Sequence, residues 1–243
     1  YILETGMNPI LEVRNLVKHY PKVRAVDGIN FSIPPGICFG FLGPNGAGKT
    51  TCIEIIEGII PPTSGEVLYK EAARTSDFHE KVGIQFQSTS LLSFLSVRET
   101  LETFHNLYKD PMPMDELIPL CHLGDILDRD NDKISGGQKQ RLMIALALVN
   151  DPDLVFLDEP TTGLDPQARR HVWDIVEKIK AKGKTIVLTT HYMDEAHGLC
   201  EEIAIIDKGK IIVRGAPDDL VRSRCSGVTV TLPRGDFPGS LEK

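Results

Sequence analysis

The segment FLGPNGAGKTT, residues 41–51, constrains the fold of this chain more than any other part of the sequence. Three glycines and a proline stand between an apolar run and a threonine pair, although each glycine weakens a helix or strand by roughly 0.5–1 kcal/mol relative to alanine. That local cost indicates that the backbone must come close to something here. The spacing from Gly43 to Thr50 matches G-x-x-x-x-G-K-[ST], a loop whose backbone N–H groups hold phosphate.

The residues on either side supply the context that this motif requires. Residues 36–43 (GICFGFLG) are a short apolar run with aromatics, which predicts a buried strand. Downstream, Cys52, Ile55 and Ile59 have helical spacing. A helix is therefore expected to begin near Lys49, and its unpaired N–H groups and dipole favour an anion at that end. The sequence thus predicts a nucleoside triphosphate site rather than a chance glycine turn.

The motif assigns contacts to individual residues. Lys49 is expected to reach the β- and γ-phosphates, and the Thr50 hydroxyl is expected to ligate Mg2+. The residues expected to hold the nucleotide here are Gly43, Pro44, Asn45, Gly46, Ala47, Gly48, Lys49, Thr50 and Thr51.

Composition narrows the classes of protein to consider. The chain has 243 residues, of which 41% are hydrophobic and 25% charged, as in an ordinary globular protein. A net charge of −7 argues against a nucleic-acid-binding surface. The five cysteines form no C-x-x-C pair, so a reducing compartment fits better than a disulfide or zinc framework. No apolar run approaches the roughly 18–20 residues that cross a bilayer, and the opening residues do not resemble a signal peptide.

The order of apolar segments indicates an α/β fold. Strands are expected at residues 10–16 and 24–33, and strands and helices alternate from residue 153 onward, which indicates a mostly parallel sheet flanked by helices. Between residues 88 and 153 the spacing is helical, with Val97 and Tyr108 in one helix. We therefore expect a P-loop NTPase core with a mostly parallel sheet, an N-terminal antiparallel β subdomain and an inserted α-helical subdomain.

Two carboxylates follow a predicted buried strand in LVFLDEP. Asp158 is expected to hold Mg2+, mostly through water, and to complete the metal shell begun by Thr50. Glu159 would then lie where a carboxylate orients and deprotonates an attacking water. The plain alternative is a strand that ends in solvated acids.

A second anion site is predicted in ISGGQKQR, residues 134–141. Ser135 is suited to cap the helix that follows, and Gly136 and Gly137 leave backbone N–H groups open beside the start of that helix. The chain thus has two phosphate-directed helix starts but one P-loop lysine. The simplest explanation is that this second site completes the nucleotide pocket of another copy.

Together these motifs resemble those of the ATP-binding-cassette (ABC) ATPases. SGGQ stands ahead of a strand that ends in Asp-Glu, with a P-loop upstream. The resemblance covers residues 9 to about 220 and implies a cassette domain over 9–226, with its helical subdomain at about 88–153, and a tail over 227–243. In that tail GVTVTLP is similar to one strand of a further subdomain, of which the tail would be the truncated start. VGIQFQSTSLLSFLSVRETL and LDEPTTGLDPQARR are most similar to ATPase subunits of bacterial drug, sodium or polysaccharide exporters.

The resemblance assigns roles outside the P-loop. His191 ends a strand at the carboxyl edge where open α/β sheets hold ligands, and it matches the switch histidine that contacts the γ-phosphate. Gln87 matches the Q-loop glutamine, which touches Mg2+ or water, with Gln85 as a nearby alternative. Tyr20 matches the aromatic that stacks on adenine, or else it is an edge-strand tyrosine. Asp165 matches the D-loop at the dimer interface, a role that is compatible with capping the next helix.

The implied site therefore has three overlapping sets of residues. The catalytic set is Glu159, His191, Lys49 and Gln87; the metal ligands are Thr50, Gln87 and Asp158; and the nucleotide contacts beyond the P-loop are Tyr20, Ser135, Gly136, Gly137, Gln138 and Asp165.

Two departures from the family pattern stand out. Ile134 replaces the usual leucine before SGGQ, a volume-conserving change. EAARTS stands where the family usually has a glycine-containing turn, so the loop at residues 70–76 is expected to differ.

The resemblance implies an ATP- and Mg2+-dependent ATPase that powers a membrane transporter, an exporter by subtype. ATP would lie between the P-loop of one subunit and Ser135–Gln138 of the other in a head-to-tail homodimer or paralogous heterodimer. The partners would be transmembrane permease subunits that hold the chain, otherwise cytoplasmic, at the inner face of the cell membrane. No nucleic-acid partner is expected. In LLSFLSV, exposed Leu91 and Phe94 would receive a helix of the permease, and Leu92 and Leu95 would pack under the helical block.

Two other functions are the alternatives. A non-transport ABC ATPase in DNA repair, chromosome organisation or translation would carry a long coiled coil between P-loop and SGGQ, or two cassettes, and this chain has neither. An ordinary P-loop kinase would not account for SGGQ or for His191.

Overall fold

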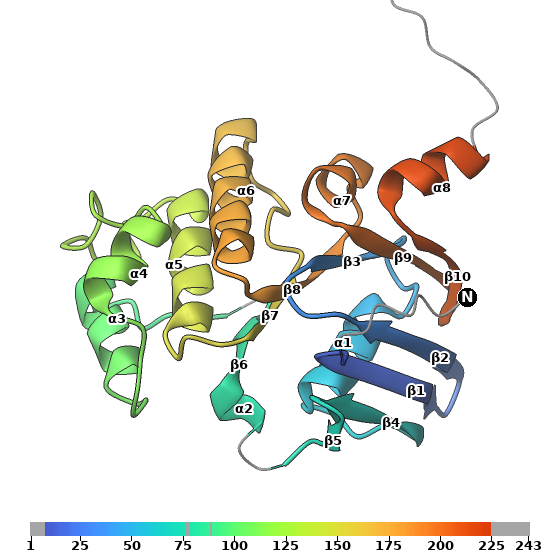
Figure 1. Cartoon of the computed structure of the whole chain (residues 1–243). Helices are drawn as coiled ribbons and strands as arrows, with labels where there is room; N and C mark the ends of the chain where they lie inside the picture. Colours follow the sequence, from blue (N-terminus) through green and yellow to red (C-terminus); the bar gives the residue numbers. More distant parts are fainter. Residues whose placement is uncertain (1–7, 76–77, 88, 225–243) are drawn as a thin grey trace, which may run out of the picture.

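Two β-sheets and eight helices make up the part of the chain that the computed structural model describes, residues 8–75, 78–87 and 89–224. One sheet is antiparallel and the other is mostly parallel (Figure 1). The predicted tail at 227–243, with its expected strand GVTVTLP, lies outside the described residues.

The larger sheet contains β3 (Cys38–Leu42), β6 (Val82–Gln85), β7 (Leu154–Asp158), β8 (Thr185–Thr190), β9 (Glu202–Asp207) and β10 (Lys210–Gly215), in the order β10-β9-β3-β8-β7-β6. All neighbours are parallel except β10, which pairs antiparallel with β9. Strands β3, β7 and β8 are buried on both faces, which is why each is an unbroken apolar run in the sequence. The expected α/β class with a mostly parallel sheet is confirmed.

The smaller sheet is the expected antiparallel subdomain. It contains β1 (Leu11–Tyr20), β2 (Val23–Ile33), β4 (Ser64–Tyr69) and β5 (Ala72–Ala73), in the order β2-β1-β4-β5. Lys70 and Glu71 form the two-residue turn between β4 and β5, and both are left-handed, with φ of 48° and 65°. Such turns usually contain glycine or asparagine. At Lys70 and Glu71 the chain thus closes a hairpin without glycine.

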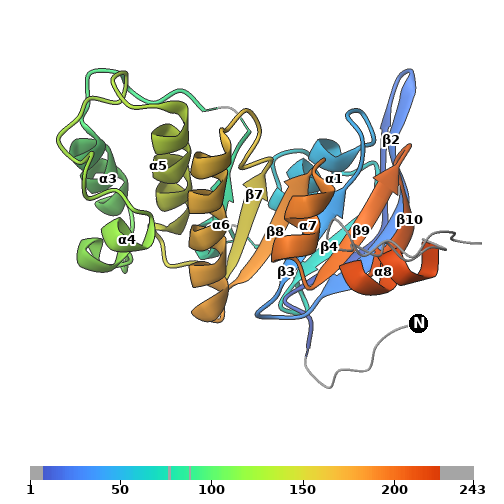
Figure 2. The same ribbon diagram turned by 90° about the horizontal axis from the view of Figure 1, so that it is seen from above.

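Helix α1 (Lys49–Glu57) packs in the apolar core that the two sheets share. Phe31 of β2 and Phe39 and Phe41 of β3 form the aromatic centre of that core, with ring centroids 5.2–5.5 Å apart. Helices α6 (Pro166–Ala181) and α7 (Met193–Leu199) cover the other face of the larger sheet (Figure 2). The P-loop helix therefore begins in the middle of the molecule.

The helical block lies beside the sheet edge formed by β6 (Figures 1 and 2). It contains α3 (Val97–His105), α4 (Met114–Leu120) and α5 (Gly136–Leu148), while α2 (Phe78–Lys81) precedes β6 and α8 (Pro217–Arg224) follows β10. Helical structure in this region was predicted correctly, but Tyr108 is not in the same helix as Val97. Helix α3 ends at His105, shortly before a segment with two prolines, which cannot continue a helix.

Helix α5 meets β6 without an intervening side chain. A Cβ atom added to Gly83 would lie 1.9 Å from the carbonyl oxygen of Ala147, so no residue other than glycine fits at this point of the strand. The C-terminal turn of α5 therefore lies directly against the backbone of β6.

Candidate functional site

The loop between β3 and α1 has the conformation that its glycines predict. Gly46 and Gly48 are left-handed, with φ of 79° and 102°. A Cβ on Gly43 would lie 2.3 Å from the Ile206 carbonyl oxygen, and one on Gly48 would lie 2.2 Å from that of Ala25. Larger residues cannot occupy these positions, because the loop is seated on the backbones of β2 and β9. The expected start of the helix at Lys49 is confirmed.

The Lys49 ammonium lies over this loop. Its side chain is buried, and Nζ donates hydrogen bonds to the carbonyl oxygens of Gly43 at 2.8 Å and Pro44 at 3.2 Å. Nζ also lies 3.8 Å from a carboxylate oxygen of Glu159. A cation at the start of a helix, held by carbonyls rather than by a close ion pair, can exchange these contacts for phosphate oxygens.

The two carboxylates stand at the carboxyl end of β7, as predicted. The Thr189 hydroxyl donates a hydrogen bond to the Asp158 carboxylate and accepts one from the Glu159 N–H at 2.9 Å. Burial raises the pKa of Asp158, and the charge of Glu159 acts in the same direction, whereas the bond from Thr189 and the charge of Lys49 lower it. Glu159 itself is left-handed, with φ of 47°. A non-glycine residue in that region stores strain, which is common at functional positions.

Glu159 is the point on which the other predicted groups converge. Oε2 accepts a hydrogen bond from Gln87 Nε2 at 3.4 Å and one from the Thr162 hydroxyl at 3.0 Å, and His191 Nδ1 lies 3.5 Å away. Gln85, the alternative to Gln87, is buried and bonds to the Phe86 carbonyl instead. The structure thus brings together residues from the P-loop, the Q-loop position, β7 and the end of β8.

A cavity of about 740 Å³ opens over these groups. Among its lining residues are Asn45, Gly46, Gly48, Lys49, Thr50, Thr51, Gln87, Glu159 and His191, all of them predicted. Val23, Arg24, Ala25, Thr162, Lys208 and Gly209 also line it, and the sequence did not predict them. The turn Asp207-Lys208-Gly209 before β10 can be recognised in the sequence, but its contact with the P-loop cannot. That contact is a hydrogen bond from Gly209 N to the Ala47 carbonyl, at 2.8 Å.

Tyr20 is not among the residues that line this cavity. It ends β1, its side chain is 44% exposed, and the Lys18 ammonium lies 5.4 Å from its ring centroid. An exposed ring at the end of a strand is free to stack, so the adenine contact stays a prediction.

The second predicted anion site lies at the start of α5, apart from the cavity. Ser135 and Gln138 form a capping box, in which the Gln138 N–H donates to the Ser135 hydroxyl at 3.3 Å. A Cβ on Gly136 would meet nothing within 4 Å, whereas one on Gly137 would lie 2.6 Å from the Ala168 Cβ. Gly136 is thus open to a ligand, while Gly137 is also required for packing against α6.

Asp165 caps α6 as predicted, with Pro166 as the first helical residue. Its carboxylate accepts from the N–H groups of Ala168 at 3.0 Å and Gln167 at 2.9 Å, and these bonds lower its pKa. The cap is therefore observed, and the contact across a dimer interface stays a prediction.

The oxygen donors near the cavity suit Mg2+, a hard cation that is usually held by one or two carboxylates together with substrate phosphates. Thr50 and Gln87 line the cavity, and Asp158 ends the strand beside it. No group of three His, Cys, Asp or Glu side chains in the described residues could hold a metal alone. The residues therefore fit a metal that arrives with the nucleotide.

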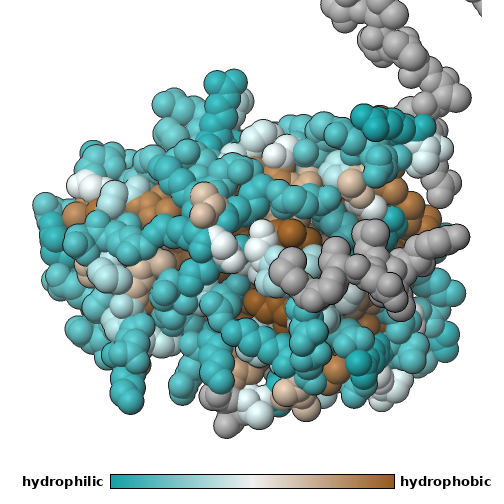
Figure 3. Space-filling model, in the orientation of Figure 1, coloured by the Kyte–Doolittle hydropathy of each residue, from teal (hydrophilic) through white to brown (hydrophobic). Residues whose placement is uncertain are grey.

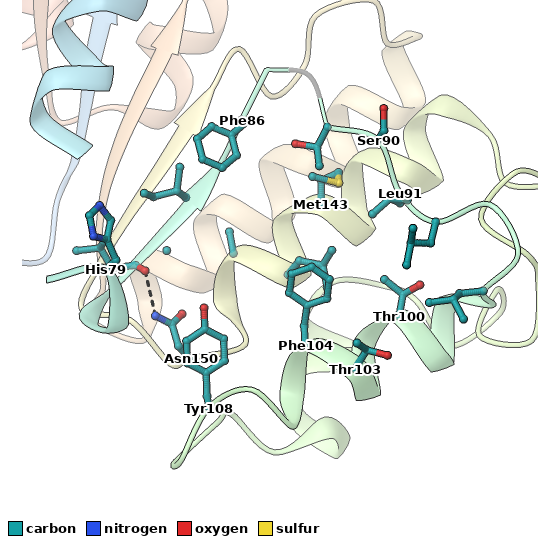
Figure 4. A pocket seen from close by; sticks show the side chains of 18 residues that line it. His79, Phe86, Ser90, Leu91, Thr100, Thr103, Phe104, Tyr108, Met143 and Asn150 are labelled. Atoms are coloured by element: carbon teal, nitrogen blue, oxygen red, sulfur yellow. Dashed lines mark hydrogen bonds between the residues drawn. The ribbon is translucent and has the colours of Figure 1, made fainter. Parts of the chain in front are cut away.

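A separate apolar cavity of about 360 Å³ lies between β6 and the helical block (Figure 4). Phe86, Phe104, Tyr108 and Met143 project into it from different segments (Figure 4). The face shown in Figure 3 is otherwise mostly hydrophilic, with hydrophobic residues visible in recesses between the elements.

The segment after Gln87 lines part of this cavity, and one prediction about it was wrong. Leu92 and Phe94 are 56% and 76% exposed, whereas Leu91 packs against the core of the helical side and Leu95 is partly buried. Phe94 is exposed as expected. Leu91, expected to be exposed, packs inward, and Leu92, expected to pack under the helical block, is exposed. The reason is that the segment turns, with Leu95 N donating to the Leu92 carbonyl at 3.2 Å, and spacing alone does not reveal which side faces inward.

Comparisons with known proteins agree with this site. The family model described as ABC transporter matches residues 26–162. A Nod factor export ATP-binding protein I of Ralstonia nicotianae is 39% identical over 96% of this chain and 75% of its own length. Another, of Paraburkholderia xenovorans, is 41% identical over 88% of this chain and 73% of its own.

Solved structures show the same architecture. The cbiO1 subunit of Clostridium perfringens, part of an ABC transporter complex, has a TM-score of 0.79 at 29% identity, covering 88% of this chain and 91% of its own. A dimeric bacterial ABC transporter cassette, MJ0796, has a TM-score of 0.76 at 27% identity, covering 85% of this chain and 98% of its own. The same cassette bound to ADP and phosphate after hydrolysis has a TM-score of 0.75 at 27% identity, with the same coverage of 85% and 98%.

The fold and the site define a P-loop ATPase, and the chain belongs to the ABC transporter family. It is an ATP-binding, ATP-hydrolysing subunit of an ABC transporter. None of the helices in the described residues has the length and apolar character needed to span a bilayer.

Proposed function

We propose that this chain powers export through separate membrane permease subunits and that Glu159 is the general base for ATP hydrolysis. The observation that carries the proposal is the convergence of Lys49, Gln87 and His191 on the Glu159 carboxylate. Export is supported by the curated relatives, which are named Nod factor export ATP-binding proteins.

The roles follow from the chemistry of each group. Glu159 orients the attacking water and accepts its proton, a contribution worth about 10²–10⁴-fold. Lys49 and the start of α1 stabilise the charge of the phosphoryl group, and His191 donates to the γ-phosphate. Thr50, Asp158 and Gln87 would hold Mg2+, which would neutralise charge on the phosphate oxygens. Burial and the charge of Glu159 disfavour the ionised form of Asp158, so a cation bound beside this carboxylate would stabilise that form.

ATP-dependent head-to-tail dimerisation is part of the proposal. Ser135 and Gly136 lie outside the cavity of their own chain, at a helix start that is open to an anion. They would close the nucleotide pocket of a second cassette, with Asp165 at the same interface. The dimeric structure of the related cassette MJ0796 supports this arrangement.

The apolar cavity is the proposed docking site for a permease helix. A concave apolar surface between two parts of a cassette, lined by Phe86, Leu92 and Phe104, accepts an amphipathic helix through spaced apolar anchors. The cavity begins next to Gln87, so its occupant would act on the segment that carries a proposed metal ligand. Such a permease would also hold the chain at the inner face of the membrane.

Transport in membrane vesicles tests the export proposal. The chain is co-expressed with the permease encoded beside it, and inside-out vesicles are supplied with ATP and candidate amphiphilic substrates. Export predicts ATP-dependent accumulation inside these vesicles, which is lost with Glu159→Gln. Accumulation only in right-side-out vesicles loaded with ATP would indicate import. ATPase activity that rises with DNA or ribosomes, without a permease complex, would overturn the transport assignment.

A further inference from the structure

Glu195 is a buried carboxylate that none of the proposed roles uses. It lies in the first turn of α7, shortly after His191, and its side chain is 0% exposed. The indole Nε1 of Trp173, on α6, donates a hydrogen bond to its Oε1 at 3.2 Å. A carboxylate without access to water is costly unless neighbouring donors stabilise it. Its position therefore requires an explanation.

The groups around Glu195 come from two segments that lead into the site. Thr161 belongs to the turn that follows Glu159, and Thr190 directly precedes His191; both are fully or almost fully buried. Burial raises the pKa of Glu195, whereas the hydroxyls of Thr190 and Thr161, the Trp173 indole and the charge of Arg169 lower it. The Glu195 carboxylate thus interacts with both the Thr161 turn and the strand end at Thr190.

The hydroxyls are close without making a full set of bonds. Oε2 of Glu195 and Oγ1 of Thr161 each lack a close hydrogen-bond partner. Thr190 Oγ1 accepts from the Tyr192 N–H at 3.0 Å, which leaves its hydroxyl proton free to donate. The hydroxyls of Thr161 and Thr190 therefore both remain available as donors, and the Glu195 carboxylate has an oxygen with unused lone pairs.

Helix α6 also contacts the segment that follows His191. The Arg169 guanidinium lies 4.5 Å from the ring centroid of Tyr192 and pairs with Asp194 at 3.5 Å. Trp173, on the same helix, donates its hydrogen bond to Glu195. The segment that follows His191 is thus attached to α6 through Arg169 and Trp173, and α6 begins at Pro166, directly after its cap Asp165.

We infer that Glu195 is a positioning residue for ATP hydrolysis: its carboxylate ties the Thr161 turn to the Thr190 strand end and so sets the separation of Glu159 and His191. The inference rests on the roles proposed above for Glu159 and His191. Glu195 has no contact with the cavity over the P-loop. Its loss is expected to alter turnover through the geometry of the two groups that it connects, and not through nucleotide binding.

The test measures steady-state ATP hydrolysis, nucleotide affinity and thermal unfolding of the full chain. Glu195→Leu keeps the volume and removes the acceptor. It should lower kcat about tenfold and leave KM within about twofold. Glu195→Gln keeps an acceptor for Trp173 and the length of the side chain, so it should restore at least about a third of kcat. A folded Glu195→Leu protein with normal kcat would overturn the inference.

A double-mutant cycle separates positioning from general destabilisation. In a His191→Ala background the position of residue 191 no longer matters, so Glu195→Leu should lower the residual kcat by less than about threefold. An equal tenfold loss in both backgrounds would contradict the inference. If Glu195→Leu does not fold, Thr161→Val is the second variant, because it removes one hydroxyl with little change of shape. It should lower kcat at unchanged KM. Normal turnover of Thr161→Val would also contradict the inference.

The two levels of the proposal fail in different ways. If His191→Ala itself keeps normal turnover, the assignment of the site is wrong. If His191→Ala is inactive while Glu195→Leu and Thr161→Val turn over normally, the site stands and only the positioning role is lost.

Discussion

The Thr189 hydroxyl donates a hydrogen bond to the Asp158 carboxylate, although the two residues belong to different strands. The same oxygen accepts the N–H of Glu159 at 2.9 Å. His191 follows directly after β8, the strand that contains Thr189. One buried hydroxyl therefore fixes a proposed metal ligand and a proposed base relative to the strand that leads to His191.

Replacing Thr189 with valine should damage both stability and turnover. Valine keeps the shape but leaves the buried Asp158 oxygen without the hydroxyl donor, at a cost of about 1–3 kcal/mol. The Glu159 N–H then keeps only its bond to the backbone carbonyl of residue 189, at 3.2 Å. Thr185→Val is the matched control, because this buried hydroxyl accepts from Gly36 N at 2.9 Å and lies at the amino end of the same strand, away from the site. Denaturant unfolding should show similar losses for both variants, and ATP hydrolysis should fall only for Thr189→Val. Equal hydrolysis in the two would contradict this reading.

Glu159→Gln should separate nucleotide binding from hydrolysis. The amide still accepts from Thr162 but has no charge to take the proton of the attacking water, so turnover should fall by about 10²–10⁴-fold. ATP affinity, measured with a fluorescent nucleotide, should persist. Lys49→Ala is the contrasting variant, since it removes the ammonium over the P-loop and should impair binding itself. Near-normal turnover of Glu159→Gln would end the assignment of the base.

ATP should dimerise the Glu159→Gln protein, and ADP should not. Gly136→Asp, added in that background, places a negative charge against the γ-phosphate and should prevent the dimer, as measured by light scattering. Gly136 is a cleaner position than Gly137, where any side chain also collides with Ala168. Gly136→Ala adds a methyl without a charge and should retain more dimer. A Gly136→Asp protein that dimerises normally would count against the head-to-tail arrangement.

Binding of the permease should depend on the apolar cavity. Leu92 and Phe104 line it and are 56% and 37% exposed, so replacing both with serine removes apolar contact area at little cost to folding. Leu107, 72% exposed and outside the cavity, is the control. Co-purification with the permease should fall for Leu92→Ser with Phe104→Ser and not for Leu107→Ser, at unchanged ATP affinity. Equal recovery of both complexes would place the interface elsewhere.

Stability should fall as the pH rises. Glu57, the last residue of α1, is buried, and burial, with the charges of Asp158 and Glu54, raises its pKa from an ordinary 4.5 to about 8. The folded protein then holds this proton more tightly than the unfolded chain, so the free energy of unfolding decreases between these two values and levels off above about pH 8. The total loss is at most about 5 kcal/mol, at about 1.4 kcal/mol for each pH unit.

Glu57→Gln provides the comparison for that prediction. The amide does not titrate, so its unfolding free energy should vary less between about pH 5 and about pH 9 in metal-free buffer. Parallel curves for the two proteins would mean that Glu57 is not responsible for the slope.

Local chemistry explains what could be predicted from the sequence. The starts of α1, α5 and α6 were located correctly because a glycine loop, a capping box and an Asp-Pro pair each specify a helix end through the few residues beside it. The strands β3, β7 and β8 are buried on both faces, so their apolar runs were also unambiguous.

Contacts between distant segments could not be predicted in this way. Lys208 reaches the cavity because the turn before β10 hydrogen-bonds to the P-loop, a pairing that depends on sheet order. Which of Leu91 and Leu92 is exposed depends on how the loop that contains them packs on the helical block. Glu195 looks like an ordinary polar residue of a short helix until the fold encloses it.

Helix α5 is packed closely near both of its ends. Its last turn lies against the backbone of β6 at Gly83, and Gly137, near its start, lies against Ala168 of α6. At 13 residues the helix is about 20 Å long, with Met143 and Leu146 at the apolar cavity and Ser135 as its cap. One continuous helix thus joins the proposed permease site to the residues that would meet the second nucleotide, so an occupant of the cavity that shifted α5 would also shift Ser135.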